Sequence, residues 1–309
     1  MKNTNKVQLN KHSNIKNTCV FNKITADSAF KSVAYLSAKR TMYVGPLKRV
    51  LEQSNGLTTL IISIDKELGL IDNHSGQHYI SKSFLIPAGS HVTIDTYDSI
   101  IVLCFLDILG TDLAKLIPSM KDSVQIENSS TCYSGIPNEL AVIEQAGEIF
   151  KRRPSAEHVF DQLNNWIDSS SSGTPLVTDT RIEKAIVLIT NNYATNLSIT
   201  DIANAVGLST PRLIQLFKQI TGIPIRRFRL CHRVFITVLN LGTGMSLIDA
   251  VVEAGFSDYS HFSRVFKELG SVKPSELFSS RNLIDIRISH RLSRGKSEEK
   301  DYSCAALAD

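Results

Sequence analysis

The chain has 309 residues, which allows two domains of ordinary size, each able to bury a core. Its net charge of +4 is too small to identify a nucleic-acid-binding protein by charge alone. No stretch has the roughly 18 consecutive apolar residues of a membrane span, and residues 1–18 lack the apolar core of a signal peptide. We therefore expect a cytoplasmic protein with no membrane partner.

The five cysteines are scattered and show no CxxC or Cys/His metal spacing, which favours a reduced compartment. They are Cys19, Cys104, Cys132, Cys231 and Cys304. Two interpretations of Cys104 and Cys132 remain, a redox sensor and a buried inert thiol. The first needs an exposed electropositive setting, which nothing in the sequence supplies.

Residues 1–25 are polar and are expected to form a flexible arm. From about Val33 the pattern becomes β-like, with a run rich in β-branched residues at 57–64. Further apolar runs at 79–86, 92–94 and 99–106 are separated by turn signals. Short strands at turn-punctuated intervals predict a small antiparallel barrel or sandwich.

After Asp107 the period changes to that of helices. A short helix is expected to end at Pro118, and two amphipathic helices follow at 138–152 and 156–167. The Ser-rich run that begins at Asp168 is the clearest linker in the chain. We place one domain at 26–168 and a linker at 169–179.

Residues 180–280 are predicted to be nearly all helical and to contain an internal repeat. A capping box at Ser198-Ile199-Thr200-Asp201 recurs 48 residues later at Ser246-Leu247-Ile248-Asp249. Gly207-Leu208 recurs as Gly255-Phe256 at the same offset. Beyond this turn the offset becomes 49, which relates Leu213 to Phe262 and Phe217 to Phe266. The repeat predicts two helix-turn-helix units joined by a long helix from about residue 225 to 240. Residues 281–309, which are polar and mixed in charge, are expected to be a disordered tail.

The second unit has the clearer recognition helix. Gly255 can supply the positive φ of a helix end, and Ser257 or Asp258 can cap the next helix. Phe262 and Phe266 lie four residues apart and form a buried face, which leaves a polar face outward.

These residues carry a family resemblance. Residues 180–278 resemble the DNA-binding domain of the AraC/XylS family of bacterial transcription regulators. The matching elements are Ile202-Ala203, Gly207-Leu208-Ser209, Leu213, Leu216-Phe217-Lys218, Thr221-Gly222, Phe228, Arg233, Ala254-Gly255-Phe256-Ser257-Asp258, Ser260, Phe262-Ser263-Arg264, Phe266-Lys267 and Pro274. Three departures are Ala250-Val251 in place of Ile-Ala, Ser271 where a Gly commonly follows the last helix, and the outward Pro211 and Ile214.

The N-terminal half resembles, more weakly, the cupin-like sensory domains that precede this module in many members of the family. Residues 84–91 are similar to a strand-turn element of those domains. The resemblance implies that this half binds a small-molecule effector or mediates dimerisation.

Outward positions on the two recognition helices are the expected contacts to DNA. The candidate base-reading residues are Arg212, Ile214, Gln215, Tyr259, Ser260, Ser263 and Arg264, and the candidate phosphate contacts are Lys218, Arg226, Arg227, Lys267 and Lys273. Gln215 can pair with an adenine edge, Ile214 can pack on a thymine methyl, and Arg264 can bind guanine through two hydrogen bonds. Helices about 34 Å apart would enter successive major-groove faces.

Other interpretations of single residues remain open. Arg226 and Arg227 could be solvated charges rather than phosphate contacts. For Arg233 we expect an ion pair or a packing role rather than base contact, and for His261 a surface or packing role.

The sequence thus predicts an α+β protein. An N-terminal cupin-like antiparallel β domain with trailing helices precedes a C-terminal all-α double helix-turn-helix domain. We expect a sequence-specific transcription regulator, activator or repressor. Its partners would be double-stranded promoter DNA, RNA polymerase, a small-molecule effector and a second copy of the chain; no cofactor is expected.

Two other classes of function stay open. One is a sensor or partner-binding protein that does not bind DNA, and the other is a metal-dependent cupin enzyme. An enzyme would need ligands from His74, His78 and His91, which have no carboxylate partner in a ligand pattern. No nucleophile elbow, phosphate loop or triad pattern occurs, so we expect no enzymatic activity.

Overall fold

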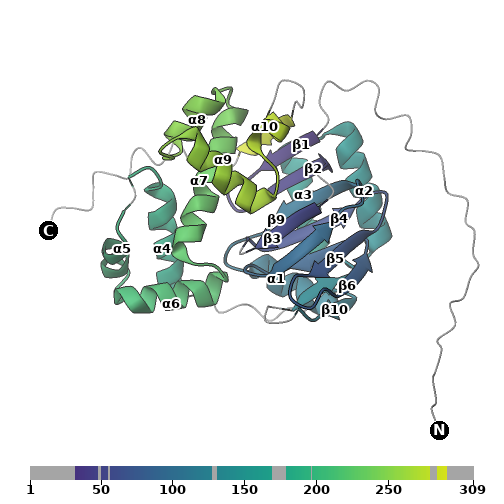
Figure 1. Ribbon diagram of the computed structural model, residues 1–309, viewed down its shortest axis with the longest axis horizontal. Coiled ribbons are helices and arrows are strands. Elements are labelled where there is room, and N and C mark those ends of the chain that lie inside the picture. The colour runs from purple at the N-terminus through teal and green to yellow at the C-terminus, as the bar shows by residue number, and fades with distance from the viewer. Residues whose placement is uncertain are drawn as a thin grey trace, which may run out of the picture.

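The computed structural model describes residues 32–47, 50–54, 56–126, 131–168, 179–195, 197–278 and 284–290. The predicted arm, all but the last residue of the linker and most of the tail lie outside these ranges. The β domain and the helical domain lie side by side (Figure 1). Within the described part of the chain, we find no helix whose length and apolar character would let it span a membrane.

The N-terminal domain is built from two sheets. The eight-stranded sheet has the order β10-β11-β7-β4-β9-β2-β1-β12, and the four-stranded sheet has the order β3-β8-β5-β6. The strands of the first are β10 (Asp122–Val124), β11 (Cys132–Ser134), β7 (Ser83–Ile86), β4 (Thr59–Ser63), β9 (Ile100–Phe105), β2 (Thr41–Pro46), β1 (Ser32–Leu36) and β12 (Ile284–Ile288). Those of the second are β3 (Val50–Ser54), β8 (His91–Asp95), β5 (Leu68–Asp72) and β6 (His78–Ser81).

Strand β4 shows why the sequence of this domain contains continuous runs of apolar residues. All five of its residues are buried, because both faces of the sheet are covered. Ile61 faces the second sheet, in a core that includes Leu70 and Phe84. Leu60 and Ile62 belong to a second core on the opposite face. The antiparallel β domain is confirmed, and apolar side chains fill the space between its sheets.

The trailing helices cover the outer face of the large sheet. They are α1 (Thr111–Leu116), the 3₁₀ turn η2 (Ile117–Ser119), α2 (Glu139–Arg152) and α3 (Ala156–Asp168). Arg40, in the β1–β2 turn, links α1 and α3 to the sheet. Its Nε donates to Asp112 of α1 at 2.7 Å, and its Nη1 donates to Asn164 of α3 at 2.5 Å.

The C-terminal domain is all-helical, as predicted. Its helices are α4 (Thr180–Asn191), α5 (Ile199–Ala205), α6 (Thr210–Thr221), α7 (Ile225–Gly242), α8 (Leu247–Glu253), α9 (Tyr259–Gly270) and α10 (Pro274–Phe278). One core joins α4, α5, α6 and the start of α7, and another joins the end of α7 to α8 and α9. Helix α7 runs from one unit to the other (Figure 1).

The prediction of a disordered tail over 281–309 is wrong for Ile284–Ile288. This segment forms β12, which pairs in parallel with β1 at the edge of the large sheet. Its alternating sequence is Ile-Asp-Ile-Arg-Ile, a period-2 pattern. A Cβ placed on Gly242 of α7 would lie 2.6 Å from Ile286, so the strand touches the helical domain directly. The unpaired edge of β1 and this apolar contact explain why the segment is ordered.

Candidate nucleic-acid interface

Two glycines set the turns of the helix-turn-helix units. Gly207 has φ of 68° and Gly255 has φ of 82°, in the left-handed region that a glycine adopts without strain. After the second turn, Asp258 is the cap: its Oδ1 accepts the N–H of His261 at 2.7 Å. That hydrogen bond lowers the pKa of Asp258 below its ordinary value. In the first unit Ser209 occupies the cap position, but its side chain makes no capping hydrogen bond.

The two capping boxes have the same geometry. Ser198 Oγ accepts the N–H of Asp201 at 3.0 Å, and Ser246 Oγ accepts the N–H of Asp249 at 3.2 Å. In both, the serine hydroxyl donates to the aspartate Oδ2 at 2.5 Å. The carboxylate thus binds the serine side chain rather than the serine N–H, because Asp is one methylene shorter than Glu. This agreement supports the internal repeat.

The buried faces of the recognition helices match as well. Leu213 and Phe217 of α6 are buried, and so are Phe262 and Phe266 of α9, which follow them at an offset of 49 residues. The ring of Phe217 lies 5.6 Å from that of Phe228 on α7, and the ring of Phe262 lies 5.5 Å from that of Phe266. Aromatic packing of this kind fixes which face of each helix is turned to solvent.

The candidate base-reading residues lie on those solvent-facing sides. Arg212, Ile214, Gln215, Tyr259, Ser260 and Arg264 are exposed, and Ser263 is half-buried. Arg212 Nη1 donates to Gln215 Oε1 at 3.0 Å, so these two side chains of α6 share one patch. Both recognition helices therefore present side chains able to reach a groove.

Four of the five candidate phosphate contacts are exposed, namely Lys218, Arg226, Lys267 and Lys273. Arg227 differs, because its side chain is only 16% exposed and its Nη1 lies 3.2 Å from Glu268 of α9. Its Nη2 also donates to the Glu268 carbonyl at 3.2 Å. This arginine joins α7 to the last turn of the second recognition helix, so it is the weakest of the five as a phosphate contact.

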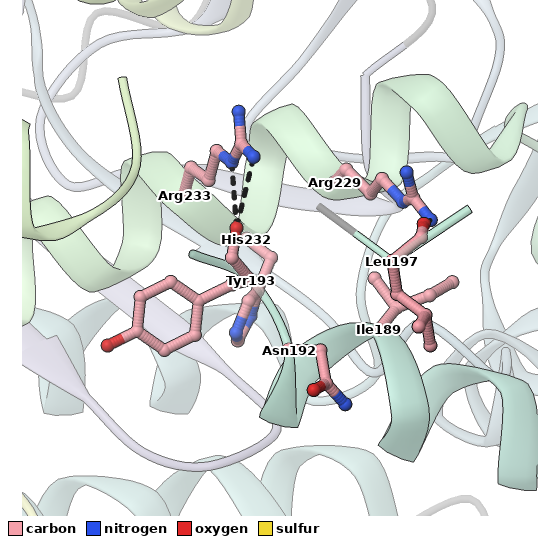
Figure 2. A pocket seen from close by; sticks show the side chains of 7 residues that line it. All are labelled: Ile189, Asn192, Tyr193, Leu197, Arg229, His232 and Arg233. Carbon is pink, nitrogen blue, oxygen red and sulfur yellow. Dashed lines mark hydrogen bonds between the residues drawn. The ribbon is translucent and has the colours of Figure 1, made fainter. Parts of the chain in front are cut away.

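Arg233 anchors the loop between α4 and α5. Its Nε and Nη2 both donate to the carbonyl of Tyr193, at 3.1 and 3.0 Å (Figure 2). Four residues earlier on α7, Arg229 donates to the carbonyl of Leu197. Both arginines point from α7 toward this loop (Figure 2). The packing role expected for Arg233 thus takes the form of hydrogen bonds to a carbonyl rather than an ion pair.

Between these two arginines in the sequence lies His232, whose ring contacts Tyr193, Phe228 and Phe235. Its Nε2 is buried and has no hydrogen-bond partner among the described residues. Burial lowers the pKa of His232 to about 4, against an opposing hydrogen bond with the backbone of Thr190. The ring is therefore neutral at neutral pH. His261 packs edge-on against Phe256, in agreement with the packing role expected for it.

In the described part of the β domain, the potential metal ligands are not clustered. His74, His78 and His91 are exposed, and among the described residues no three His, Cys, Asp or Glu side chains are grouped to hold a metal ion. Cys104 and Cys132 are buried. Burial raises the pKa of Cys132 to about 11, which keeps the thiol protonated, as expected of an inert cysteine.

A contact that we did not predict joins the domains. Ser271, just after α9, makes two hydrogen bonds with the backbone of Glu52 on β3. The only signal for it in the sequence was a serine at a position where the resemblance leads us to expect glycine.

Comparison with known proteins agrees with this geometry. A family model described as a helix-turn-helix domain matches residues 202–280. The arabinose operon regulatory protein of Escherichia coli is 37% identical over 100 residues, which are 32% of this chain and 34% of that protein. Transcriptional activator RhrA of Rhizobium meliloti is 35% identical over 85 residues, 26% of this chain and 27% of its own length. The chain thus matches about a third of the length of these curated relatives or less.

A solved structure extends the likeness to both domains. ToxT from Vibrio cholerae, bound to (E)-4-(8-methylnaphthalen-1-yl)but-3-enoic acid, superposes with a TM-score of 0.53. The match covers 79% of this chain and 99% of ToxT at 16% sequence identity. At that identity the match shows the shared fold, a β domain followed by a helical domain.

Proposed function

We propose that this chain, whose C-terminal domain belongs to the AraC/XylS family of bacterial transcription regulators, is a DNA-binding transcription regulator of the cytoplasm. The observation that carries this proposal is the pair of equivalent helix-turn-helix units, each with a buried aromatic face and an exposed recognition face. One continuous helix, α7, joins the units. We assign the chain no catalytic activity.

In this proposal α6 and α9 enter successive major-groove faces of one duplex. Arg264 makes two hydrogen bonds to a guanine edge, and Gln215 binds an adenine edge. The exposed cations Lys218, Arg226 and Lys267 contact phosphates and release counterions. Since α9 carries Arg264 beside two hydroxyl side chains and α6 carries Ile214 outward, most of the base discrimination comes from α9.

The N-terminal domain has the regulatory role in this proposal. Its support is the shared fold with ToxT, which has been solved with a small carboxylic acid bound. In this chain, a small molecule bound to the N-terminal domain would control the helical domain. Contacts with RNA polymerase and with a second copy of the chain stay predictions.

Selection of duplexes from a random pool, followed by binding titrations at several salt concentrations, tests the proposal. We expect affinity for the selected duplex to fall steeply with salt. Arg264→Ala should weaken binding by about 1–3 kcal/mol and relax sequence preference at one position. Arg152→Ala is the matched control, because Arg152 lies on α2 of the other domain and its side chain is 80% exposed.

Two outcomes would count against the proposal. Failure to enrich any duplex would favour a sensor or partner-binding protein that does not bind DNA. An affinity for duplex DNA that does not change with salt concentration would favour the same alternative. Equal affinities of the Arg264→Ala and Arg152→Ala proteins for the selected duplex would remove Arg264 from the base-reading set.

A further inference from the structure

The two recognition helices end in the same way. Gly222 follows α6 with φ of 77°, and Ser271 follows α9 with φ of 57°. These positions are 49 residues apart, the offset that relates Leu213 to Phe262. Both residues are therefore the left-handed C-caps of equivalent helices, and both contact the N-terminal domain.

Ser271 holds the second unit through its hydroxyl. Its Oγ accepts the N–H of Glu52 at 2.7 Å and donates to the carbonyl of Glu52 at 2.8 Å. Strand β3, which contains Glu52, is at the edge of the four-stranded sheet, and β8 is its one strand partner among the described residues. Edge strands carry unpaired backbone groups, and a hydroxyl can satisfy one donor and one acceptor together.

Ser271 makes this contact from a left-handed backbone conformation. A left-handed conformation strains a non-glycine residue, and glycine would adopt it without that strain. Glycine has no side chain with which to bind Glu52. A serine at this position therefore loses stability within its own domain and gains a contact to the other domain.

Gly222 holds the first unit through close backbone contact. A Cβ on Gly222 would lie 2.9 Å from the Cβ of Ala88 and 3.0 Å from its carbonyl oxygen. A Cβ on Gly89 would lie 2.9 Å from the carbonyl oxygen of Gly222. Leu57, Ala88 and Ile108 of the N-terminal domain also pack against the core of the first unit. The turn at 87–89 thus packs against the C-terminal end of α6.

Strand β8 connects the two contacts. The turn that meets Gly222 leads directly into β8, and β3, which meets Ser271, is hydrogen-bonded along β8. A displacement of this one strand therefore moves both contact points.

We propose that the N-terminal domain clamps the two helix-turn-helix units at the equivalent C-caps of their recognition helices, and so sets the spacing of those helices. The hydroxyl of Ser271 is the part of the clamp that can be released. Because both contacts are at C-caps, the exposed side chains Gln215 and Arg264 lie outside them. This inference goes beyond the proposed function, because it concerns how the domains are joined and holds whether or not the chain binds DNA.

Hydrogen exchange at the Glu52 amide of the full chain gives the first test. Ser271→Gly keeps the left-handed turn but removes the hydroxyl, and Ser271→Ala removes the hydroxyl while keeping the Cβ. Both variants should exchange the Glu52 amide about tenfold faster than the unaltered protein. Ser275→Ala, on the exposed side of α10, is the control and should leave the rate unchanged. Unchanged protection of Glu52 in both Ser271 variants would overturn the clamp.

Distance distributions between spin labels test the spacing. Val187→Cys on α4 and Val252→Cys on α8 place one label on each unit, at positions 54% and 62% exposed. Cys19 and Cys304 are replaced by Ser, and Cys104, Cys132 and Cys231 are buried. We expect a narrow distribution that broadens or shifts when Ser271→Gly is added. Ala88→Glu, which forces a larger side chain against Gly222, should have the same effect from the other contact.

An identical distribution in all three proteins would mean that α7 alone fixes the spacing, and the proposal would be wrong. Neither measurement uses DNA. Failure of the clamp is therefore distinguishable from failure of the proposed function.

Discussion

Acid should weaken the packing of α7 on α4 through one side chain, His232. In the part of the chain that the structure describes, no group forms a hydrogen bond with the buried Nε2 of this ring, and burial lowers the pKa of His232 from 6.5 to about 4. The unfolded chain therefore binds a proton between those pH values that the folded chain does not. The contribution of the neutral His232 ring to the free energy of unfolding is therefore complete above about pH 6.5 and decreases as the pH is lowered.

The size of the effect follows from the two pKa values. At about 1.4 kcal/mol per pH unit, the loss is about 2 kcal/mol at pH 5 and approaches about 3 kcal/mol at pH 4. Urea unfolding followed by circular dichroism at about pH 7 and about pH 5 measures it. His232→Phe keeps an aromatic ring between Phe228 and Phe235 but cannot titrate.

We therefore expect the variant to lose about 2 kcal/mol less than the unaltered protein between the two pH values. The matched control is His158→Gln, which removes an exposed imidazole from α3. Equal losses of stability in the unaltered protein and in His232→Phe would refute the idea that burial keeps this ring neutral.

Four further substitutions test the packing, the caps and the ion pair between Arg40 and Asp112 by urea unfolding. Phe217→Ala removes a fully buried ring and should cost about 3–5 kcal/mol; a loss below 1 kcal/mol would contradict the core position. Ser246→Ala should cost about 1 kcal/mol, whereas Ser209→Ala should cost almost nothing because its hydroxyl makes no capping bond; equal costs would contradict the two cap geometries. Arg40→Met leaves the Asp112 carboxylate, 3% exposed, without its cation and should cost about 3 kcal/mol, so an unchanged midpoint would show that the pair is not stabilising.

The helix-turn-helix units could be predicted because their signals are local. Gly255, the cap at Asp258 and the pair Phe262 and Phe266 lie within one short stretch, and each acts on its immediate neighbours. The spacing of the repeat then places the same elements in the first unit. Assignment of individual side chains to bases or phosphates is not tested by the fold and stays a prediction.

The contacts between the domains could not be predicted in this way. Glu52 and Ser271 are 219 residues apart, and neither segment alone indicates that it has a partner. The strand Ile284–Ile288 did carry a signal, since its residues alternate between apolar and charged. That signal was outweighed by the charged residues that follow it. Its partner, β1, is at the other end of the chain.

The pairing of β1 with β12 has a consequence for synthesis of the protein on the ribosome. All five residues of β1 are buried in the finished fold, yet its outer edge is closed only by the last strand of the described chain. A nascent chain therefore carries an open apolar edge until both recognition helices have been translated. Premature termination just after α10 would leave that edge free to pair with another copy, so incomplete products should aggregate rather than accumulate as soluble helical domains.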